Sequence, residues 1–552
     1  MASIWSLVLT LVLTWPACLD LSTEALGSQD ADTMKHLWTV WWIRAELLRG
    51  SIPFSTDLVN FPEGMQLYPI EPLNGLIVLL LAPLSIVTAS NVAALLNLTA
   101  TGLCAALLGR DLSNSRWGGL AAGTLLQGSA IATFTIHVGV GELQHLWWLP
   151  LGLLAWRRLR LGMTWGSTLL LGGALGGATL SCFYHGFFLA TGVAVLSLTT
   201  LWAGARTPRL LACYVGAAGL GLLVTVPLMS TFATTYGTEG PSSLTLVQAV
   251  LEEHGQPLTD PAAARLELAH LALPRWGDWD TLSRQDRGYA GGRYVGWIAL
   301  GLALTALVRD PKRAGPWLAV ALVALLMALG SLLVVSGEEI SLGSGQRLRL
   351  PFFYLNRLLG HLGEGLNFPV RFVALSSTAM AAMAAIAASK VRRPWIVTLL
   401  ALAATVEVHA NQLTPLRLER FSLLEYEGLA VVADPTRPTV DIGLTLRPDP
   451  ESRHAALTAQ MITEQPLHAV PLERIEYFAP EGARYVGALP LMDAIVDPFK
   501  YGRETSLGDQ RPSLCLLQQR GLTRIQLLGT RGSSPIPHGL VRMLSELLGE
   551  PL

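Results

Sequence analysis

The sequence predicts a mainly α-helical fold, a polytopic membrane protein with a small external α/β domain at its C-terminal end. The first indication is composition. Of the 552 residues, 51% are hydrophobic and only 14% are charged, whereas a soluble domain usually carries about a quarter charged residues. The second indication is where the charges are missing. Four stretches, 72–109, 161–205, 210–238 and 314–337, contain no Asp, Glu, Lys or Arg.

These runs are long enough to cross a bilayer as helices, since a spanning helix needs roughly 20 mostly apolar residues. They are continuous rather than alternating, which favours helices over the strands of a barrel. Read in order, the apolar segments predict about eleven spans, near 3–21, 91–109, 117–136, 142–156, 164–182, 186–204, 210–232, 293–308, 316–335, 369–388 and 394–411. Residues 3–18 are open to two interpretations, a first span or a cleaved signal. The span is favoured because the basic start of a signal peptide is missing.

Every second loop between the predicted spans is basic. The basic residues are Arg110 and Arg116, then Arg157, Arg158 and Arg160, then Arg206 and Arg209, then Arg309, Lys312 and Arg313, and finally Lys390, Arg392 and Arg393. The short loops 137–141 and 183–185 carry no Lys or Arg. Basic loops stay on the cytoplasmic side of a membrane. The long loops 22–73, 233–292 and 336–368 and the C-terminal tail are therefore predicted to lie outside.

Two regions depart from the simple pattern of spans and loops. Residues 72–109 are long enough for nearly two crossings, but the alternation of basic loops permits only one. Because Pro83 interrupts the run, residues 74–88 are predicted to form an interfacial or re-entrant helix. From about residue 412 charged residues and prolines return, and strand-like segments occur at 429–433 and 524–528. The prediction is a membrane domain over 1–411 and an external α/β domain over 412–552, within the ordinary size of a domain.

The first external loop carries the most informative polar residues. Asp30 and Asp32 follow directly on the first span, and Asp32 can cap a helix that starts at Thr33. A carboxylate at the rim of a membrane cavity can also act as a general base, and two carboxylates at this spacing can hold a divalent cation such as Mg²⁺ or Mn²⁺. Spacing alone favours the cap, and both interpretations stay open. Lys35 and His36, on the same helix, are candidate substrate contacts.

Other external carboxylates are candidates for the same site. Glu63 and Glu71 lie in the Pro- and Gly-rich segment 61–74, for which a surface turn is the favoured interpretation and a substrate contact by Glu63 the alternative. Glu142 and His145 stand at the external start of the fourth span, three residues apart, so they face the same way on a helix. An ionisable residue at membrane depth usually faces a partner or a wet cavity. A rim pair in headgroup water is the favoured interpretation, and a place in the cavity is the alternative.

Aromatic and basic residues complete the list of candidates. Tyr184 and His185 occupy the tight external turn between the fifth and sixth spans. An interfacial aromatic turn is the favoured interpretation, and a lining of the same cavity is the alternative. Arg371 lies at the external start of the tenth span. An Arg at that height can bind a phosphate with two parallel hydrogen bonds, or it can reach to the headgroups of native phospholipids.

Six of these candidates, Asp32, Lys35, His36, Glu63, Glu142 and Arg371, fall within short motifs in a fixed order. The motifs are Asp32-x-x-Lys-His-x-Trp-x-x-Trp-Trp42, Phe61-Pro-Glu-Gly64, Gly141-Glu142 and Pro369-x-Arg-Phe372. In that order they resemble uncharacterised bacterial membrane proteins grouped with the GT-C glycosyltransferases, which use polyprenyl-phosphate sugars. The resemblance runs across most of the chain. It implies many transmembrane helices, a long first external loop with a catalytic Asp, and a sugar taken from a lipid phosphate on the outer side of a bacterial inner membrane, with the C-terminal domain in the periplasm.

The resemblance also implies roles for single residues. Asp32 becomes the general base or a metal ligand, with Asp30 as the alternate; Glu142 becomes a second cavity carboxylate and Arg371 a contact to the lipid phosphate. The predicted function is transfer of a sugar from a membrane-embedded polyprenyl-phosphate donor to an acceptor. The alternatives are a transporter or flippase for a lipid-linked solute and a non-catalytic assembly protein. No Walker loop, Gly-x-Ser-x-Gly elbow or His-Glu-x-x-His motif occurs. The net charge of −1 by itself says nothing about nucleic acid, and no nucleic-acid partner is predicted.

Overall fold

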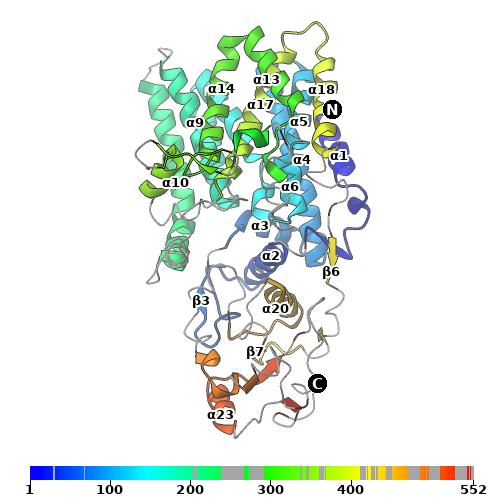
Figure 1. Ribbon diagram of the computed structural model, residues 1–552, viewed down its shortest axis with the longest axis vertical. Helices are drawn as coiled ribbons and strands as arrows, with labels where there is room; N and C mark the ends of the chain where they lie inside the picture. Colours follow the sequence, from blue (N-terminus) through cyan, green and yellow to red (C-terminus); the bar gives the residue numbers. More distant parts are fainter. Residues whose placement is uncertain are drawn as a thin grey trace. The chain divides into compact units, whose positions relative to one another are not determined.

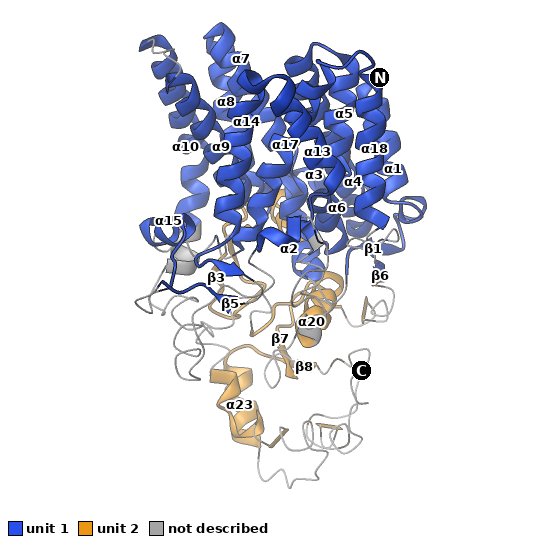
Figure 2. Ribbon diagram, turned by 45° about the horizontal axis from the view of Figure 1, so that its top comes forward, with its two compact units in different colours: residues 1–40, 70–233, 244–421 blue, residues 41–69, 234–243, 422–552 orange. Residues whose placement is uncertain are grey.

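The structure is a computed structural model, and it divides the chain into two compact units (Figure 2). Unit 1 comprises Met1–Val40, Ile70–Ala233 and Leu244–Phe421, and unit 2 comprises Trp41–Pro69, Thr234–Ser243 and Ser422–Leu552. This division differs from the boundary predicted near residue 412, because residues 41–69 of the first long loop belong to unit 2. The structure describes residues 1–28, 32–67, 69–202, 208–237, 266–271, 273, 291–335, 338–342, 347–359, 366, 368–410, 418, 420–423, 429–430, 433–442, 450–469, 485–492, 494–495, 510–526, 528, 542, 544–545 and 548.

Unit 1 is built from helices that run side by side (Figure 1). They are α1 (Ala2–Leu13), α3 (Pro72–Leu80), α4 (Ile86–Ser113), α5 (Arg116–Gln127), α6 (Ala130–His137), α7 (Trp148–Gly162), α8 (Trp165–Ser181), α9 (Phe183–Trp202), α10 (Pro208–Gly237), α13 (Trp297–Arg309), α14 (Pro311–Ala328), α15 (Pro351–Leu359), α17 (Val373–Ala388) and α18 (Trp395–Ala410). Helix α2 (Thr33–Leu48) begins in unit 1 and continues into unit 2.

The remaining regular elements are short. They are the 3₁₀ helices η1 (Ala17–Leu19), η2 (Gly141–Gln144), η3 (Leu268–Leu271), η5 (Gly291–Arg293) and η6 (Pro369–Phe372), and the strands β1 (Glu24–Leu26), β2 (Ser55–Thr56), β3 (Met65–Gln66), β4 (Val334–Val335), β5 (Glu338–Glu339) and β6 (Arg420–Ser422). Strand β2 pairs antiparallel with β3, and β4 pairs antiparallel with β5. The long external loops of the prediction therefore contain ordered elements.

Local sequence explains where several helices begin and end. Helix α3 is complete before Pro83, which cannot continue a helix. Ser85 then opens α4 by accepting a hydrogen bond from the Thr88 N–H at 3.2 Å. Helix α4 ends at Asn114, whose φ of 53° places it in the left-handed region that terminates helices. The helix predicted over 74–88 is thus the nine-residue α3, which is too short to cross a bilayer.

Each predicted span overlaps a helix, but three differ clearly from the prediction. The first, 3–21, is the twelve-residue α1 followed by η1. The segment 117–136 is a pair, α5 and α6, bent by 43°. The segment 142–156 is helical only from Trp148, because η2 and a turn precede it and Pro150 suits the first turn of a helix. Among the described residues, five helices are long and apolar enough to cross a membrane, or six if the bent pair is one span. The chain is an integral membrane protein of α-helical type.

Helix α17 lies at the centre of unit 1. Every residue from Val373 to Ala388 is buried, and the segment is rich in alanine. Small side chains let neighbouring helices approach closely in membranes, and α4, α5, α13 and α14 all pack on α17. The bundle is thus assembled around a helix that carries no charged residue.

One end of unit 1 collects the loops that the sequence predicts to be cytoplasmic. Arg157, after α7, pairs with Asp111 at the end of α4. Lys390, after α17, pairs with Asp310 between α13 and α14 at 3.1 Å. The Arg313 guanidinium donates to the Leu112 carbonyl. Four basic loops that are far apart in sequence therefore meet at a single end, as their alternation along the chain requires.

Unit 2 contains a pair of parallel strands, β7 (Thr439–Asp441) and β8 (Arg524–Gln526), and the helices α20 (Pro450–Thr463) and α23 (Arg511–Gln519). Strand β8 confirms most of the strand predicted at 524–528; of the other, 429–433, residues 431–432 lie outside the described part and 429–430 form a 3₁₀ turn. Residues 41–69 are tied in by backbone, since the Phe61 N–H donates to the Leu467 carbonyl at 3.0 Å. Burial lowers the pKa of His468 to about 4, so this core contains a neutral imidazole.

Candidate functional site

A turn between α6 and α7, residues 138–145, is the place where predicted site residues of unit 1 meet. Gly139 has a φ of 64°, and Gly141 opens η2. Both positions need glycine because of close neighbours. A Cβ on Gly139 would lie 2.0 Å from Thr33 Oγ1, and one on Gly141 would lie 2.2 Å from Glu71 Oε2. The start of α2 and the residue before α3 therefore pack directly on this turn.

Glu142 in this turn forms an ion pair with Arg371 in η6. Glu142 Oε1 lies 3.6 Å from Arg371 Nη1, and Arg371 is only 7% exposed. The Arg371 Cζ lies 4.6 Å from the ring centroid of Tyr184 and 4.7 Å from that of Phe368. The Phe368 N–H donates to Tyr184 Oη at 3.0 Å, which fixes the two rings to each other. Contact with two aromatic faces holds the guanidinium in place. The structure thus brings Glu142, Tyr184 and Arg371 together.

His145 and His185 lie close to this ion pair. Both side chains are fully buried, and within the described part of the chain none of their ring nitrogens has a hydrogen-bond partner. His185 is near enough to His145 and Arg371 for electrostatic interaction. A buried imidazolium without an acceptor would lose its hydration uncompensated. Arg371, rather than either histidine, therefore supplies the positive charge here.

A chain of buried polar side chains joins the same turn to three helices. The carboxylate of Glu71 is fully buried. Its Oε1 lies 2.8 Å from His36 Nδ1, and its Oε2 accepts from Asn74 Nδ2 at 2.8 Å. Asn97 Nδ2 then donates to Asn74 Oδ1 at 3.4 Å, and Trp147 Nε1 donates to Asn97 Oδ1 at 3.0 Å. Glu71, for which sequence alone favours a surface turn, is an interior residue, because its partners come from α2 and α3.

Asp32 stands at the start of α2, beside the same turn. The helix begins at Thr33 as predicted, and Thr33 Oγ1 donates to the Val138 carbonyl at 3.1 Å. The Asp32 carboxylate lies 3.2 Å from Lys35 Nζ, one turn along the helix. Asp32, Lys35, His36, Glu142, His145, Tyr184, His185 and Arg371 therefore all belong to one end of unit 1. This end is opposite to the basic loops. Trp147, just before α7, contacts Asn97 of α4 on the side of these residues, whereas Arg157, near the end of α7, pairs with Asp111 near the end of α4.

Two predicted site residues are not part of this group. Asp30 lies outside the described residues. Glu63 belongs to unit 2, where its Oε1 lies 2.8 Å from Arg520 Nη2. Within the described part of the chain, no three His, Cys, Asp or Glu side chains are arranged to hold a metal ion. The described residues therefore do not form a complete ligand set, and a divalent cation at Asp30 and Asp32 stays a prediction.

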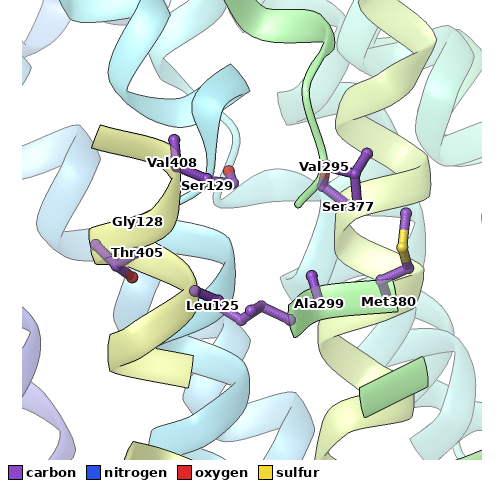
Figure 3. Close-up of a pocket in the computed structure, with 10 residues that line it drawn as sticks. Leu125, Gly128, Ser129, Val295, Ala299, Ser377, Met380, Thr405 and Val408 are labelled. Atoms are coloured by element: carbon purple, nitrogen blue, oxygen red, sulfur yellow. The ribbon is translucent and has the colours of Figure 1, made fainter. Parts of the chain in front are cut away.

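Two small hollows open among the helices. One is lined by Arg371 together with Ile131, Phe134, Gly292, Phe368 and Val370, so the guanidinium faces a mostly apolar wall. The other lies between α5, α13, α17 and α18 (Figure 3). Its polar groups are the hydroxyls of Ser129, Ser377 and Thr405, and no charged residue lines it. Only the first hollow combines a charge with apolar surface.

Glu407 is a carboxylate that the sequence interpretation passed over. It lies in α18, inside the predicted span 394–411, and an ionisable residue there is itself a signal. Its Oε1 accepts from Tyr294 Oη at 2.6 Å and from the Trp297 N–H at 2.8 Å, and its Oε2 accepts from the Ile298 N–H at 3.1 Å. A carboxylate at a helix N-terminus satisfies free N–H groups and complements the dipole. Glu407 thus anchors the start of α13.

No protein-family model matches this chain, and no curated protein matches it. Among solved structures, the chain is similar to the Archaeoglobus fulgidus oligosaccharyltransferase in complex with Zn and sulfate, with a TM-score of 0.49 and 14% identity over 85% of this chain and 62% of that one. It is also similar to AglB of the same organism, in complex with an inhibitory peptide and a dolichol-phosphate (TM-score 0.45, 12% identity, 85% and 64% covered). ArnT from Cupriavidus metallidurans bound to undecaprenyl phosphate gives a TM-score of 0.35 and 15% identity, with 84% and 85% covered. The chain spans less than two thirds of the length of the two archaeal oligosaccharyltransferases. These structural neighbours are GT-C-type membrane glycosyltransferases.

Proposed function

We propose that this protein is a membrane glycosyltransferase, which moves a sugar from a polyprenyl-phosphate donor to an acceptor at the external face of the membrane. The observation that carries the proposal is the meeting of Glu142, Tyr184 and Arg371 at one end of a membrane bundle, beside the start of the helix that bears Asp32. Each of these residues was singled out by the sequence for such a role, and they come from four separate segments.

Arg371 is suited to bind the phosphate of the donor. Guanidinium groups bind phosphate oxygens through two parallel hydrogen bonds. Here the guanidinium is held by two aromatic rings and faces a mostly apolar hollow, which fits a ligand with a charged head and a hydrocarbon chain. Glu142 is its counter-ion. A phosphate that approaches Arg371 would take over this role and release the carboxylate.

Transfer then requires a proton acceptor. The hydroxyl oxygen of the acceptor attacks the anomeric carbon of the sugar, and the bond from that carbon to the phosphate oxygen breaks. The hydroxyl proton passes to a carboxylate, for which we assign Asp32, with Glu142 as the alternative. The lipid phosphate leaves with one more negative charge, which Arg371 stabilises. Lys35, His36, His145, Tyr184 and His185 are the proposed contacts to the substrates.

A transporter for a lipid-linked solute would place ionisable groups along a path near the middle of the membrane. Of the carboxylates inside the predicted spans, Asp20 and Glu142 stand at the ends of their spans, and the oxygens of Glu407 are occupied by the start of α13. The cluster around Arg371 lies at the end of the bundle. These positions favour transfer at a membrane surface over transport through the membrane.

Replacing Asp32 tests the proposal directly. General-base catalysis typically contributes 10²–10⁴-fold, so Asp32→Asn should lower the rate of sugar transfer by about that factor and leave the folded protein intact. The assay supplies radiolabelled polyprenyl-phosphate monosaccharides to membrane vesicles and follows the label into the acceptor. Asp57→Asn, at an exposed carboxylate of unit 2, is the control and should transfer at the wild-type rate. Undiminished turnover by Asp32→Ala would exclude Asp32 as the base.

A further inference from the structure

Glu71 is a fully buried carboxylate to which the proposed function assigns no role. It is the residue before α3, yet its carboxylate makes no capping hydrogen bond to that helix. Instead both oxygens are directed into the protein, one to His36 and the other to Asn74, at 2.8 Å each. A buried carboxylate is costly unless its oxygens are satisfied. The Glu71 carboxylate is therefore held in one position by His36 and Asn74, and it restrains the groups that pack against it.

The group that packs against Glu71 is the backbone of Gly141. Any side chain at position 141 would begin 2.2 Å from Glu71 Oε2 and 2.9 Å from Glu71 Cδ. Gly141 is followed directly by Glu142, so the position of Gly141 also determines the position of Glu142, whose carboxylate pairs with Arg371. Moving the Glu71 carboxylate by one bond length would therefore displace the turn that carries Glu142.

The same carboxylate also restrains the helix that bears Asp32. His36 lies one turn after Asp32 in α2, and the His36 N–H donates to the Asp32 carbonyl at 3.1 Å. The ring of His36 is bound to Glu71. The positions of two proposed reacting groups, Asp32 and Glu142, thus both depend on contacts with the buried carboxylate of Glu71.

We infer that Glu71 is a positioning residue, which sets the separation between the Asp32 helix and the Glu142–Arg371 pair, and that Gly141 is the matching residue that leaves room for it. This inference rests on the proposed function for its catalytic consequence, but the contacts themselves do not depend on it. A misplacement of about 1 Å at a reacting centre can lower the rate by about 100-fold.

The test uses the steric match. Gly141→Ala should lower kcat for sugar transfer by up to about 100-fold. Because Asp is shorter than Glu by one methylene group, the double variant Gly141→Ala with Glu71→Asp should recover most of that loss, although Glu71→Asp alone is impaired. Gly173→Ala in α8 is the matched control, since nothing lies within 4 Å of a Cβ there. Two independent losses of stability would not compensate each other, so recovery of activity would indicate the steric match. A folded double variant that shows no recovery would overturn the inference.

A second readout does not require transfer. Amide hydrogen exchange of the peptide containing residues 139–147, measured on the purified full-length protein in detergent, should speed up in Gly141→Ala and in Glu71→Asp, and should return toward the wild-type rate in the double variant that combines them. Gly173→Ala should leave this peptide unchanged. If exchange follows this pattern while no polyprenyl-phosphate sugar is used, the positioning role stands and the proposed function fails. Unchanged exchange in both single variants would remove the positioning role, whatever the activity.

Discussion

The two ends of unit 1 carry charges in different surroundings. At the end with the basic loops, the side chains of Arg157 and Asp111 are 24% and 28% exposed. At the other end, the side chains of His36 and Glu71 are 5% and 0% exposed, and those of Arg371 and Glu142 are 9% and 18% exposed. Exposed ion pairs add little to stability, about 0–1 kcal/mol, whereas a buried pair is costly to assemble and costly to break. The first end has the features of a topology signal and the second those of a binding site.

The largest expected contrast between the ends is their accessibility from outside the cell. Ser22 and Arg158 are both exposed and lie in segments predicted on opposite sides. With the five native cysteines replaced, Ser22→Cys should react with a membrane-impermeant maleimide in intact cells, and Arg158→Cys only after permeabilisation. Mass-tag gel shifts measure the labelling. Reaction of both variants from the same side would contradict the predicted orientation and remove the external site.

Breaking one ion pair at each end should separate their contributions to stability. Arg371→Leu leaves Glu142 with a largely buried, uncompensated charge, so the free energy of unfolding in mixed micelles should fall by roughly 2–4 kcal/mol. Asp111→Asn, at the more exposed and only partly buried pair, should change it by less, about 1 kcal/mol. Equal losses at the two ends would mean that burial does not distinguish them.

In the transfer assay, Arg371→Lys should not retain full activity, because an ammonium group cannot bind phosphate in the same bidentate way.

A smaller effect is expected where a charge is buried for a structural reason. Glu407→Gln keeps the shape of the side chain but removes the negative charge that caps α13. The loss should be about 1–2 kcal/mol, the usual range for a helix cap and its dipole term, with sugar transfer close to the wild-type rate. Unfolding titrations and the transfer assay measure the two quantities. A loss of transfer out of proportion to the loss of stability would move Glu407 into the site.

Much of the bundle could be predicted from sequence because hydropathy is a local property. The charge-free run at 161–205 contains both α8 and α9, and the predicted span 369–388 matches η6 followed by α17. Hydropathy could not predict the break in the helix after α5. Gly128 is there because a Cβ would lie 2.1 Å from Thr405 Oγ1 on α18, and that neighbour is remote in sequence.

The candidate site was predictable in its members but not in its pairings. Asp32, Glu142 and Arg371 were chosen one by one, from helix starts and from residue chemistry at the membrane surface. The contact between Glu142 and Arg371 depends on how η2 and η6 are brought together by the fold, which no local pattern encodes. Glu71 was assigned to a surface turn for the same reason, since its burial depends on α2. Pro150, by contrast, was a local signal for the start of α7 that could have been used.

Two neighbouring helices are shorter than a membrane is thick. Helix α13 has 13 residues and α18 has 16, or roughly 20 and 24 Å at 1.5 Å per residue, against about 30 Å of hydrocarbon. Trp297 begins α13 at one end of the bundle and Trp395 begins α18 at the other; they are 61% and 41% exposed. Tryptophan prefers the interfacial level, and local thinning of the bilayer is one way to accommodate a short hydrophobic segment. If the bilayer thins on this flank, we expect lipids with short acyl chains to gather beside α13 and α18, where the two leaflets are closer together.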